Sequence, residues 1–269
     1  MTKEEYPNII YKYRNWTDKH NKNVFLKNQL YLSSPKTFND PFDCRIPENF
    51  HLLDTQEKIE DYVTLFRNRR SEFVVNEEIL NEEVEITRYR LTNYLEKYHN
   101  LNEEILFEKQ DAHFGILSMS MNWNSILMWS HYANNHKGYC IGFWEEKLRN
   151  SYFFKGGPVI YNPKYEYPII DPNNNNQIEV GFIQTHNKAY DWKYEQEYRF
   201  TKIFDEENPS NEERILTFDD SYIAEINIGL EMQEKDRKII INLAKKRGIK
   251  VYEIEKIPFK FEITRKEIK

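Results

Sequence analysis

Short stretches rich in β-branched and aromatic residues, several with alternating polar and apolar positions, recur at both ends of the chain. This pattern is typical of β-strands, because successive side chains of a strand point to opposite faces. Turn-forming residues such as Pro35 and the Asn39-Asp40-Pro41 triplet separate some of them. We expect strands at residues 9–14, 30–34, 115–120, 138–143, 158–162, 195–204, 222–229, 249–254 and 259–264.

Between residues 54 and 112 the apolar positions recur with helical spacing instead. One stripe contains Ile59, Tyr62, Val63 and Phe66, and a second contains Leu80, Val84, Thr87, Leu91, Leu95 and Tyr98. Neither Pro nor Gly interrupts residues 48–114. We therefore expect a helical hairpin, followed by a third helix, as an insertion at residues 54–112 within a single domain of residues 1–269. Shorter helices are expected near residues 22–28, 125–136, 180–190 and 231–248.

Together these elements predict an α+β fold, with a mostly antiparallel or split β-sheet, short helices and the helical insertion. The strand–helix–strand order from residue 222 to residue 254 predicts one local crossover between parallel strands. A doubly wound nucleotide fold would need regular βα alternation and a glycine-rich phosphate turn. The chain has only 8 glycines, none of them in GxGxxG or GxxxxGK, so that fold is not expected.

Composition narrows the functional classes. The formal net charge is -6, and no block of basic residues suggests duplex binding, while the 19 Tyr and 17 Phe suit aromatic-lined pockets. The two cysteines cannot form a disulfide framework in 269 residues. The first residues lack a secretory pattern, and no apolar run is long enough to span a membrane. We expect a cytoplasmic protein with no membrane partner, and the sequence leaves its oligomeric state open.

Two motifs in the first 43 residues carry candidate binding groups. Lys12 and Arg14 alternate in YKYR and so lie on one strand face, either as solvated bases or as a clamp for phosphate or carboxylate. The turn-rich loop SSPKTFNDPFD holds Asn39, Asp40 and Asp43. Its acids either cap nearby amides in a rigid turn or position polar groups at a ligand.

The segment MWSHYANNHKGYCIGF, residues 128–143, is dense in residues suited to chemistry. Trp129 and Tyr132 share one face of the expected helix, so the segment forms either packed core or the wall of a pocket. His131 and His136 are five positions apart, which does not match a helical metal-binding pair, so no metal is expected. Cys140 has the pattern of a small buried thiol rather than a nucleophile.

The fourth motif is DWKYEQEYRF. On a strand, Glu195, Glu197 and Arg199 would face the same side, which fits either a solvated face or the wall of a polar cleft. In a cleft, the arginine would keep one carboxylate ionised. Trp192 and Tyr194 are near enough to stack on a planar ligand.

Taken together, YKYR, LYLSSPKTFNDPFDC, GILSMS, LMWSHYANNHKGYCIGF and DWKYEQEYRF resemble a bacterial and phage family of unknown function, DUF2971. That family implies no activity. The order of an early arginine, a serine-bearing strand and a late Glu-x-Glu is also similar to that of ADP-ribosyltransferases, which hold NAD in a cleft between two small sheets. This second resemblance implies that Arg14 binds the dinucleotide, that Ser33 or Ser34 shapes the nicotinamide pocket, and that Glu197 stabilises the sugar cation.

The leading hypothesis is an NAD-consuming enzyme, either an ADP-ribosyl transferase or an NAD glycohydrolase, acting as a toxin or phage-defence effector on a protein or nucleic-acid acceptor. Its predicted catalytic residues are Glu197, Arg14 and His131. Its predicted cofactor-binding residues are Lys12, Ser33, Ser34, Asn39, Asp40, Asp43, Trp129, Tyr132, His136, Glu195 and Arg199. One alternative is a binding module for a nucleotide or protein without chemistry. Another is a metal-dependent nuclease built from Asp40, Asp43, Glu195, Glu197 and Lys193.

Overall fold

The fold is organised around one eight-stranded sheet, and a computed structural model describes residues 6–152 and 156–268. The strand order is β12-β11-β10-β4-β1-β3-β8-β5. Its members are β1 (Ile9–Arg14), β3 (Phe114–Ser120), β4 (Tyr139–Trp144), β5 (Gly156–Pro158), β8 (Glu197–Ile203), β10 (Ile223–Ile228), β11 (Lys250–Lys256) and β12 (Ile263–Glu267). Neighbouring strands are antiparallel except β10 and β11, which helix α8 (Glu234–Lys246) connects as a parallel crossover. The predicted α+β class and this crossover are confirmed.

The sheet is nearly split between β1 and β3. Their ladder is limited to Tyr11 opposite Ser120, whereas β1 pairs with β4 along its whole length and β3 pairs with β8 over seven positions. Beyond that single pair, β1 and β3 separate from each other. The side chains and backbone groups of β1 and β3 beyond this pair therefore face a gap instead of a paired strand.

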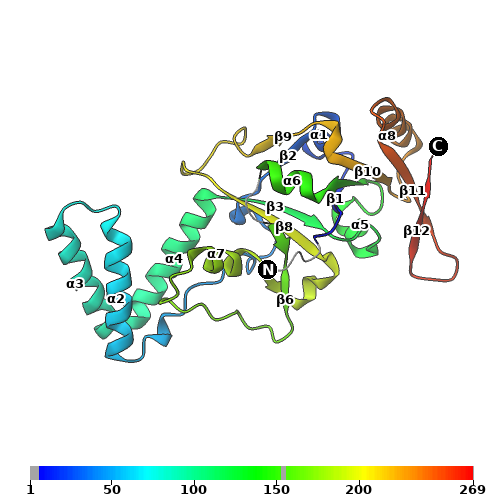
Figure 1. The fold of residues 1–269 in the computed structure, drawn as a ribbon. Coiled ribbons are helices and arrows are strands. Elements are labelled where there is room, and N and C mark those ends of the chain that lie inside the picture. The colour runs from blue at the N-terminus through cyan, green and yellow to red at the C-terminus, as the bar shows by residue number, and fades with distance from the viewer. Residues whose placement is uncertain (1–5, 153–155, 269) are drawn as a thin grey trace.

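Apolar side chains cover both faces of the sheet. On one face, the core contains Ile10, Leu117 and Ile141 with residues from α1 (Lys19–Leu26), α6 (Glu145–Tyr152) and α8. On the other face, Tyr11 and Tyr13 pack with Trp129 of α5 (Ile126–Tyr132). Figure 1 shows α1, α6 and α8 along one side of the sheet.

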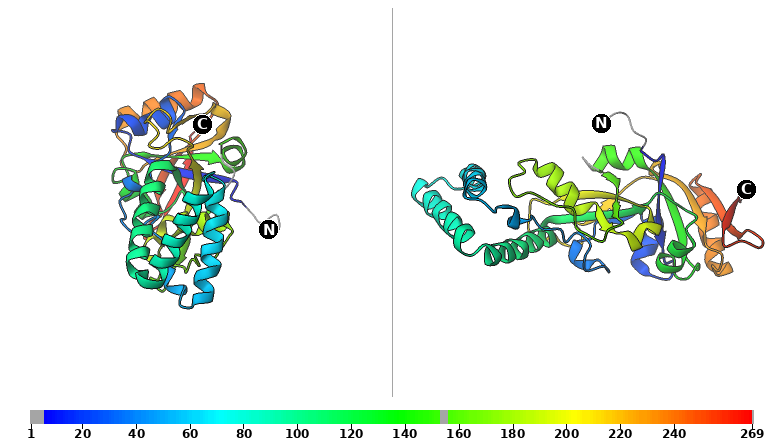
Figure 2. Two further views of the ribbon diagram at one scale, coloured as in Figure 1. Left: turned by 90° about the vertical axis from the view of Figure 1, so that its left-hand side faces the viewer. Right: turned by 90° about the horizontal axis from the view of Figure 1, so that it is seen from below.

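Three long helices form an arm at one end of the molecule, opposite the end that carries α8, β11 and β12 (Figure 2). They are α2 (Gln56–Ser71), α3 (Glu77–Asn93) and α4 (Leu95–His113), and their apolar stripes form a separate core around Phe50, Tyr62 and Leu80. Asn76 caps α3 by accepting from two backbone amides. The second predicted stripe is interrupted at Tyr94, where the backbone leaves helical geometry.

The remaining elements are short. They are β2 (Gln29–Tyr31), which pairs with β9 (Ile215–Thr217), and β6 (Ile160–Asn162), which pairs with β7 (Asn187–Ala189), next to α7 (Gln177–Thr185). The strand expected at residues 30–34 is shorter, because Pro35 begins a 3₁₀ turn, and Ser33 instead bridges to Ile116. None of the described helices combines the length and the apolar run that a membrane span requires.

Candidate functional site

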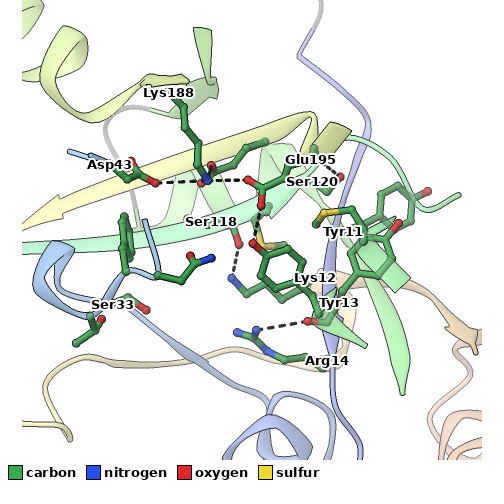
Figure 3. A pocket seen from close by; sticks show the side chains of 17 residues that line it. Tyr11, Lys12, Tyr13, Arg14, Ser33, Asp43, Ser118, Ser120, Lys188 and Glu195 are labelled. Carbon is green, nitrogen blue, oxygen red and sulfur yellow. Dashed lines mark hydrogen bonds and ion pairs between the residues drawn. The ribbon is translucent and has the colours of Figure 1, made fainter. Parts of the chain in front are cut away.

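A cavity of about 340 Å³ lies where β1 and β3 separate, and we call it the central pocket (Figure 3). Its volume falls within the range of about 300–1,000 Å³ that is typical of small-molecule sites. Its lining comes from β1, the loop after β2, β3, α5, β7 and the start of β8. The lining residues are Tyr11, Lys12, Tyr13, Arg14, Ser33, Thr37, Phe38, Asn39, Asp43, Ser118, Met119, Ser120, Met128, Tyr132, Lys188, Glu195 and Glu197.

One wall of the central pocket is basic. Lys12 reaches across the gap and donates from Nζ to the carbonyl of Ser118. Burial lowers the pKa of Lys12 well below its usual value and the neighbouring Arg14 lowers it further, against the opposing effect of Glu197. The guanidinium of Arg14 makes one long bond, of 3.4 Å, to the carbonyl of Tyr13, and its buried Nε has no partner among the described residues. Arg14 therefore has donors left for an anionic ligand.

The opposite wall is a buried cluster of charged side chains. Arg199 is fully buried, and it donates to Asp43 in two bonds of 2.9 Å and to Glu197 in two bonds of 2.8 Å. The Nζ atom of Lys188 lies 2.7 Å from Glu195, 3.3 Å from Glu197 and 3.4 Å from Asp43. Three carboxylates thus share two cations, which leaves the cluster with one net negative charge.

The contacts within this cluster favour the charged forms of Glu197 and Lys188. Burial by itself raises the pKa of Glu197, but the charges of Arg199 and Lys188 outweigh burial and hold it at about 2. Burial likewise lowers the pKa of Lys188, and the surrounding carboxylates reverse that effect and raise it above its usual value. Glu197 is therefore a permanent anion and Lys188 a permanent cation.

Glu195 reaches the cluster from outside the strand. It ends a 3₁₀ helix, Tyr190–Glu195, and Gln196 then takes a left-handed conformation with φ 42° before β8 begins at Glu197. The expected strand over 195–204 was therefore wrong at its start, because this turn interrupts the alternation. The Ser120 hydroxyl donates to the Glu195 carbonyl at 2.7 Å and anchors the turn, which still presents the Glu195 carboxylate to Lys188.

Tyr132 connects α5 to this acidic wall. Its hydroxyl donates to Oε1 of Glu195 at 2.5 Å. Burial raises the pKa of Tyr132 and the charge of Glu195 raises it further, so the side chain stays a phenol. Tyr132 is only partly buried and lines the pocket, so a bound ligand can contact this hydroxyl.

Much of the rest of the 128–143 segment is buried and supports the positions of Tyr132 and Arg14. Trp129 is fully buried, stacks on His136 at 6.2 Å and donates from its indole nitrogen to Trp123 at 2.8 Å. The chain leaves α5 through left-handed residues 134–136. At Gly138 a Cβ would lie 2.1 Å from the Arg14 carbonyl, so this position tolerates only glycine beside β1.

The loop that carries Asp43 is fixed against β8. Asp40 accepts from the Phe42 amide at 2.9 Å, the Asp43 amide donates to the Asp40 carbonyl, and the ring of Phe38 lies 5.5 Å from the Arg199 guanidinium. Cys44 holds a left-handed φ of 58°. The turn chemistry of this loop therefore serves to place the Asp43 carboxylate on Arg199.

The structure brings most of the predicted site residues together. Lys12, Arg14, Ser33, Asn39, Asp43, Tyr132, Glu195 and Glu197 all line the central pocket, and Arg199 lies behind it. Five predicted residues lie elsewhere. Ser34 donates to the Asp111 carbonyl, Asp40 lines a neighbouring cavity, His131 is exposed beside the Tyr194 hydroxyl, and Trp129 and His136 stack outside the pocket lining.

Sequence reasoning did not identify Lys188, whose ammonium holds all three carboxylates. The available signal was a charge imbalance. The two acidic motifs supply the three carboxylates of the cluster but only one arginine, so a second cation was needed. The serines and methionines of β3 and α5 in the pocket wall carried no comparable signal. Since Lys188 and Arg199 already occupy the space between the carboxylates, these residues do not fit a magnesium ion, and Lys193 lies outside the pocket lining.

Residues 128–200 match the model of a family described as a protein of unknown function, DUF2971. This match confirms the resemblance to that family and spans Tyr132, Lys188, Glu195, Glu197 and Arg199. The searches of curated proteins and of solved structures find no match. The resemblance to ADP-ribosyltransferases stays a prediction.

Proposed function

We propose that the central pocket binds a nucleotide-type ligand and that the protein consumes NAD, either by transferring ADP-ribose or by hydrolysing NAD. One observation carries this proposal. Arg14, Ser33 and Glu197 come from three distant segments and line the same pocket. This is the arrangement that a dinucleotide cleft needs, with a cationic residue for phosphate and a negative charge near the ribose.

The opposite charges of the two walls support this assignment. Lys12 offers its side-chain nitrogen and Arg14 its guanidinium as donors to phosphate oxygens, and an anionic phosphate favours the protonated form of Lys12. The facing cluster carries one excess negative charge in a buried setting. A fixed negative charge favours the oxocarbenium-like cation that forms as the bond from ribose to nicotinamide breaks. Nicotinamide leaves with the bonding electron pair as a neutral molecule. Water, or the nucleophile of an acceptor, then adds to the anomeric carbon of the ribose and releases its proton to solvent.

The two late glutamates take different roles in this proposal. Glu197 is ionised and held by Arg199 and Lys188, so it supplies fixed charge and transfers no proton. Glu195 has one oxygen on Lys188 and the other on the Tyr132 hydroxyl. Because Tyr132 is only partly buried, a ribose hydroxyl that enters the pocket can bond to this pair.

One observation favours a second candidate function, a binding module without chemistry. Both carboxylate oxygens of Glu197 already accept hydrogen bonds from Arg199, and one also accepts from Lys188. A carboxylate with this many partners has little capacity left for a ribose hydroxyl. A module of this kind would hold the nucleotide at Lys12 and Arg14 and release it intact.

The test is nicotinamide release from NAD by the purified protein, followed by chromatography, together with NAD binding measured by calorimetry. We expect turnover by the native chain and its loss in Glu197→Gln. Ser33→Ala tests the pocket without touching the charged cluster, whereas Tyr132→Phe leaves Lys188 and Arg199 paired but removes one hydrogen bond to Glu195. If the native chain turns over NAD and Glu197→Gln does so at the same rate, Glu197 has no part in the mechanism.

The matched control is Glu255→Gln, which makes the same change at an exposed position of β11. It should retain full turnover. Recovery of intact NAD from a tight complex would favour the binding module, whereas absence of NAD binding to the native chain would remove the proposal. An unregulated NAD-consuming enzyme depletes a pool that every cell needs, which is consistent with a toxin or phage-defence effector.

A further inference from the structure

A second cavity, of about 450 Å³, shares Asp43 and Lys188 with the central pocket as a common wall. It lies between the loop of residues 40–46, the loop that follows β6, strand β7 and the start of the 3₁₀ helix Tyr190–Glu195. We call it the aromatic cavity. Binding in the aromatic cavity does not depend on the proposed nucleotide chemistry, because that chemistry takes place on the other side of the common wall.

Four aromatic rings line the aromatic cavity. Phe42, Tyr165 and Tyr167 are 65%, 64% and 47% exposed. Transfer of such large aromatic side chains out of water is favourable, so their exposure is costly. Exposed apolar surface gathered around a hollow is typical of a binding site. The ring of Trp192 lies 4.7 Å from the ammonium of Lys188, so this ring already serves as a platform for a cation.

All but one of the charged residues in the described lining are acidic. Asp40, Glu166 and Asp191 line the aromatic cavity, in addition to the shared Asp43. Among the described lining residues, the one cation is Lys188, and its charge is taken up by the buried carboxylates of the common wall. The cavity is therefore electronegative, both from its carboxylates and from the faces of its rings.

The loop after β6 is shaped to hold these groups in place. Asn162 accepts from the Lys164 amide at 2.9 Å and donates from its side chain to the Glu166 carbonyl. Tyr165 takes a left-handed φ of 57°, which is costly for a residue with a large side chain, and its hydroxyl lies 3.4 Å from Asp191. The loop thus holds a strained tyrosine against one of the acids of the cavity.

From these contacts we infer that the aromatic cavity binds an organic cation, a protonated amine or guanidinium group carried on a short chain. Aromatic faces attract such cations, and the carboxylates accept their hydrogen bonds. Two sources offer this chemistry, a free polyamine and a basic side chain of a polypeptide. The central pocket has the opposite preference, so the common wall separates an anion site from a cation site.

The test compares n-butylguanidinium and n-butylammonium with n-butylurea, a neutral molecule of similar shape, by calorimetry on the full chain. We expect both cations to bind, butylurea to bind about tenfold more weakly, and cation affinity to fall as salt is added. Spermidine and a blocked arginine tripeptide then distinguish the two sources, and binding of either supports the proposal. Equal affinity for butylurea and the cations would overturn it.

Matched variants locate the binding. Tyr167→Ala should weaken cation binding by about tenfold, whereas Tyr89→Ala, which removes a similarly exposed ring from α3, should leave it unchanged. Glu166→Gln combined with Asp191→Asn should weaken cations and spare butylurea. Its control is Glu146→Gln combined with Glu255→Gln, two exposed acids outside the cavity. Unchanged cation binding in both cavity variants would place the cation elsewhere and refute the inference.

Discussion

Replacing Arg199 by methionine tests the physical claim on which the central pocket depends, that a buried arginine keeps Glu197 ionised. The guanidinium is fully buried and bonds to Asp43 and Glu197 through four charged hydrogen bonds. Methionine is flexible and fills much of the same space without the charge. The variant therefore leaves both carboxylates buried with Lys188 as their remaining cation.

Two independent estimates give the size of the effect. Removal of one partner from a buried ion pair costs about 3–5 kcal/mol. The pKa of Glu197 is about 2, compared with 4.5 for an unperturbed glutamate, and this net result of burial, Arg199 and Lys188 corresponds to about 3 kcal/mol of favourable interaction. Since domains are stable by about 5–15 kcal/mol, we expect the variant to fold with a much smaller free energy of unfolding.

The pH dependence of the free energy of unfolding shows whether the loss of stability comes from buried charge. Because the folded-state pKa of Glu197 lies below 4.5, its stabilising contribution is complete above that pH and is lost as the pH falls towards 2. Without Arg199, burial acts with less opposition and raises the pKa of Glu197, so protonation of Glu197 favours the folded variant. Urea unfolding measured from about pH 7 to about pH 4 should therefore show the deficit of the variant shrinking.

The matched control is Arg67→Met. Arg67 is 38% exposed and pairs with Glu77 on the surface of the helical arm, so its loss should cost less than about 1 kcal/mol. The reasoning is refuted if Arg199→Met is no more destabilising than Arg67→Met. It is also refuted if the deficit stays constant across the pH range, because charge burial would then not be its cause.

Three further predictions concern residues around the pocket. Gly138→Ala should lower the stability in thermal unfolding by about 1–3 kcal/mol, since its Cβ would meet a β1 carbonyl at 2.1 Å. Gly181→Ala has open space around it inside α7 and should raise the stability by about 0.5–1 kcal/mol. Equal effects of the two changes would contradict this packing. Tyr132→Phe removes a donor to a carboxylate and should lower the free energy of unfolding by about 1–3 kcal/mol, and no loss in urea titrations would discount that bond. Burial raises the pKa of both Cys44 and Cys140, so a thiol reagent should label them only after unfolding, and rapid labelling of the native chain would disprove their burial.

The sequence predicted the strands well where the alternation is regular and flanked by turn residues. The expected bounds of β1 match, and β3 and β4 begin within one residue of the prediction. The prediction failed at Glu195, because a left-handed Gln196 cannot be recognised from an alternating pattern that continues through it. The candidate site was predicted as separate pairs and loops, each consistent with either a solvated surface or a pocket.

The sequence by itself determined what depends on neighbouring residues. The spacing in YKYR placed Lys12 and Arg14 on one side of a strand, and the FNDPFD turn chemistry made a rigid loop around Asp43. Only the tertiary structure decided that β1 separates from β3 after one paired residue, that Arg199 bonds to a carboxylate 156 positions away, and that Lys188 completes the cluster. The reason is that side-chain periodicity follows from backbone geometry over a few residues. A buried ion pair forms instead from whichever charges the packed chain brings together out of water.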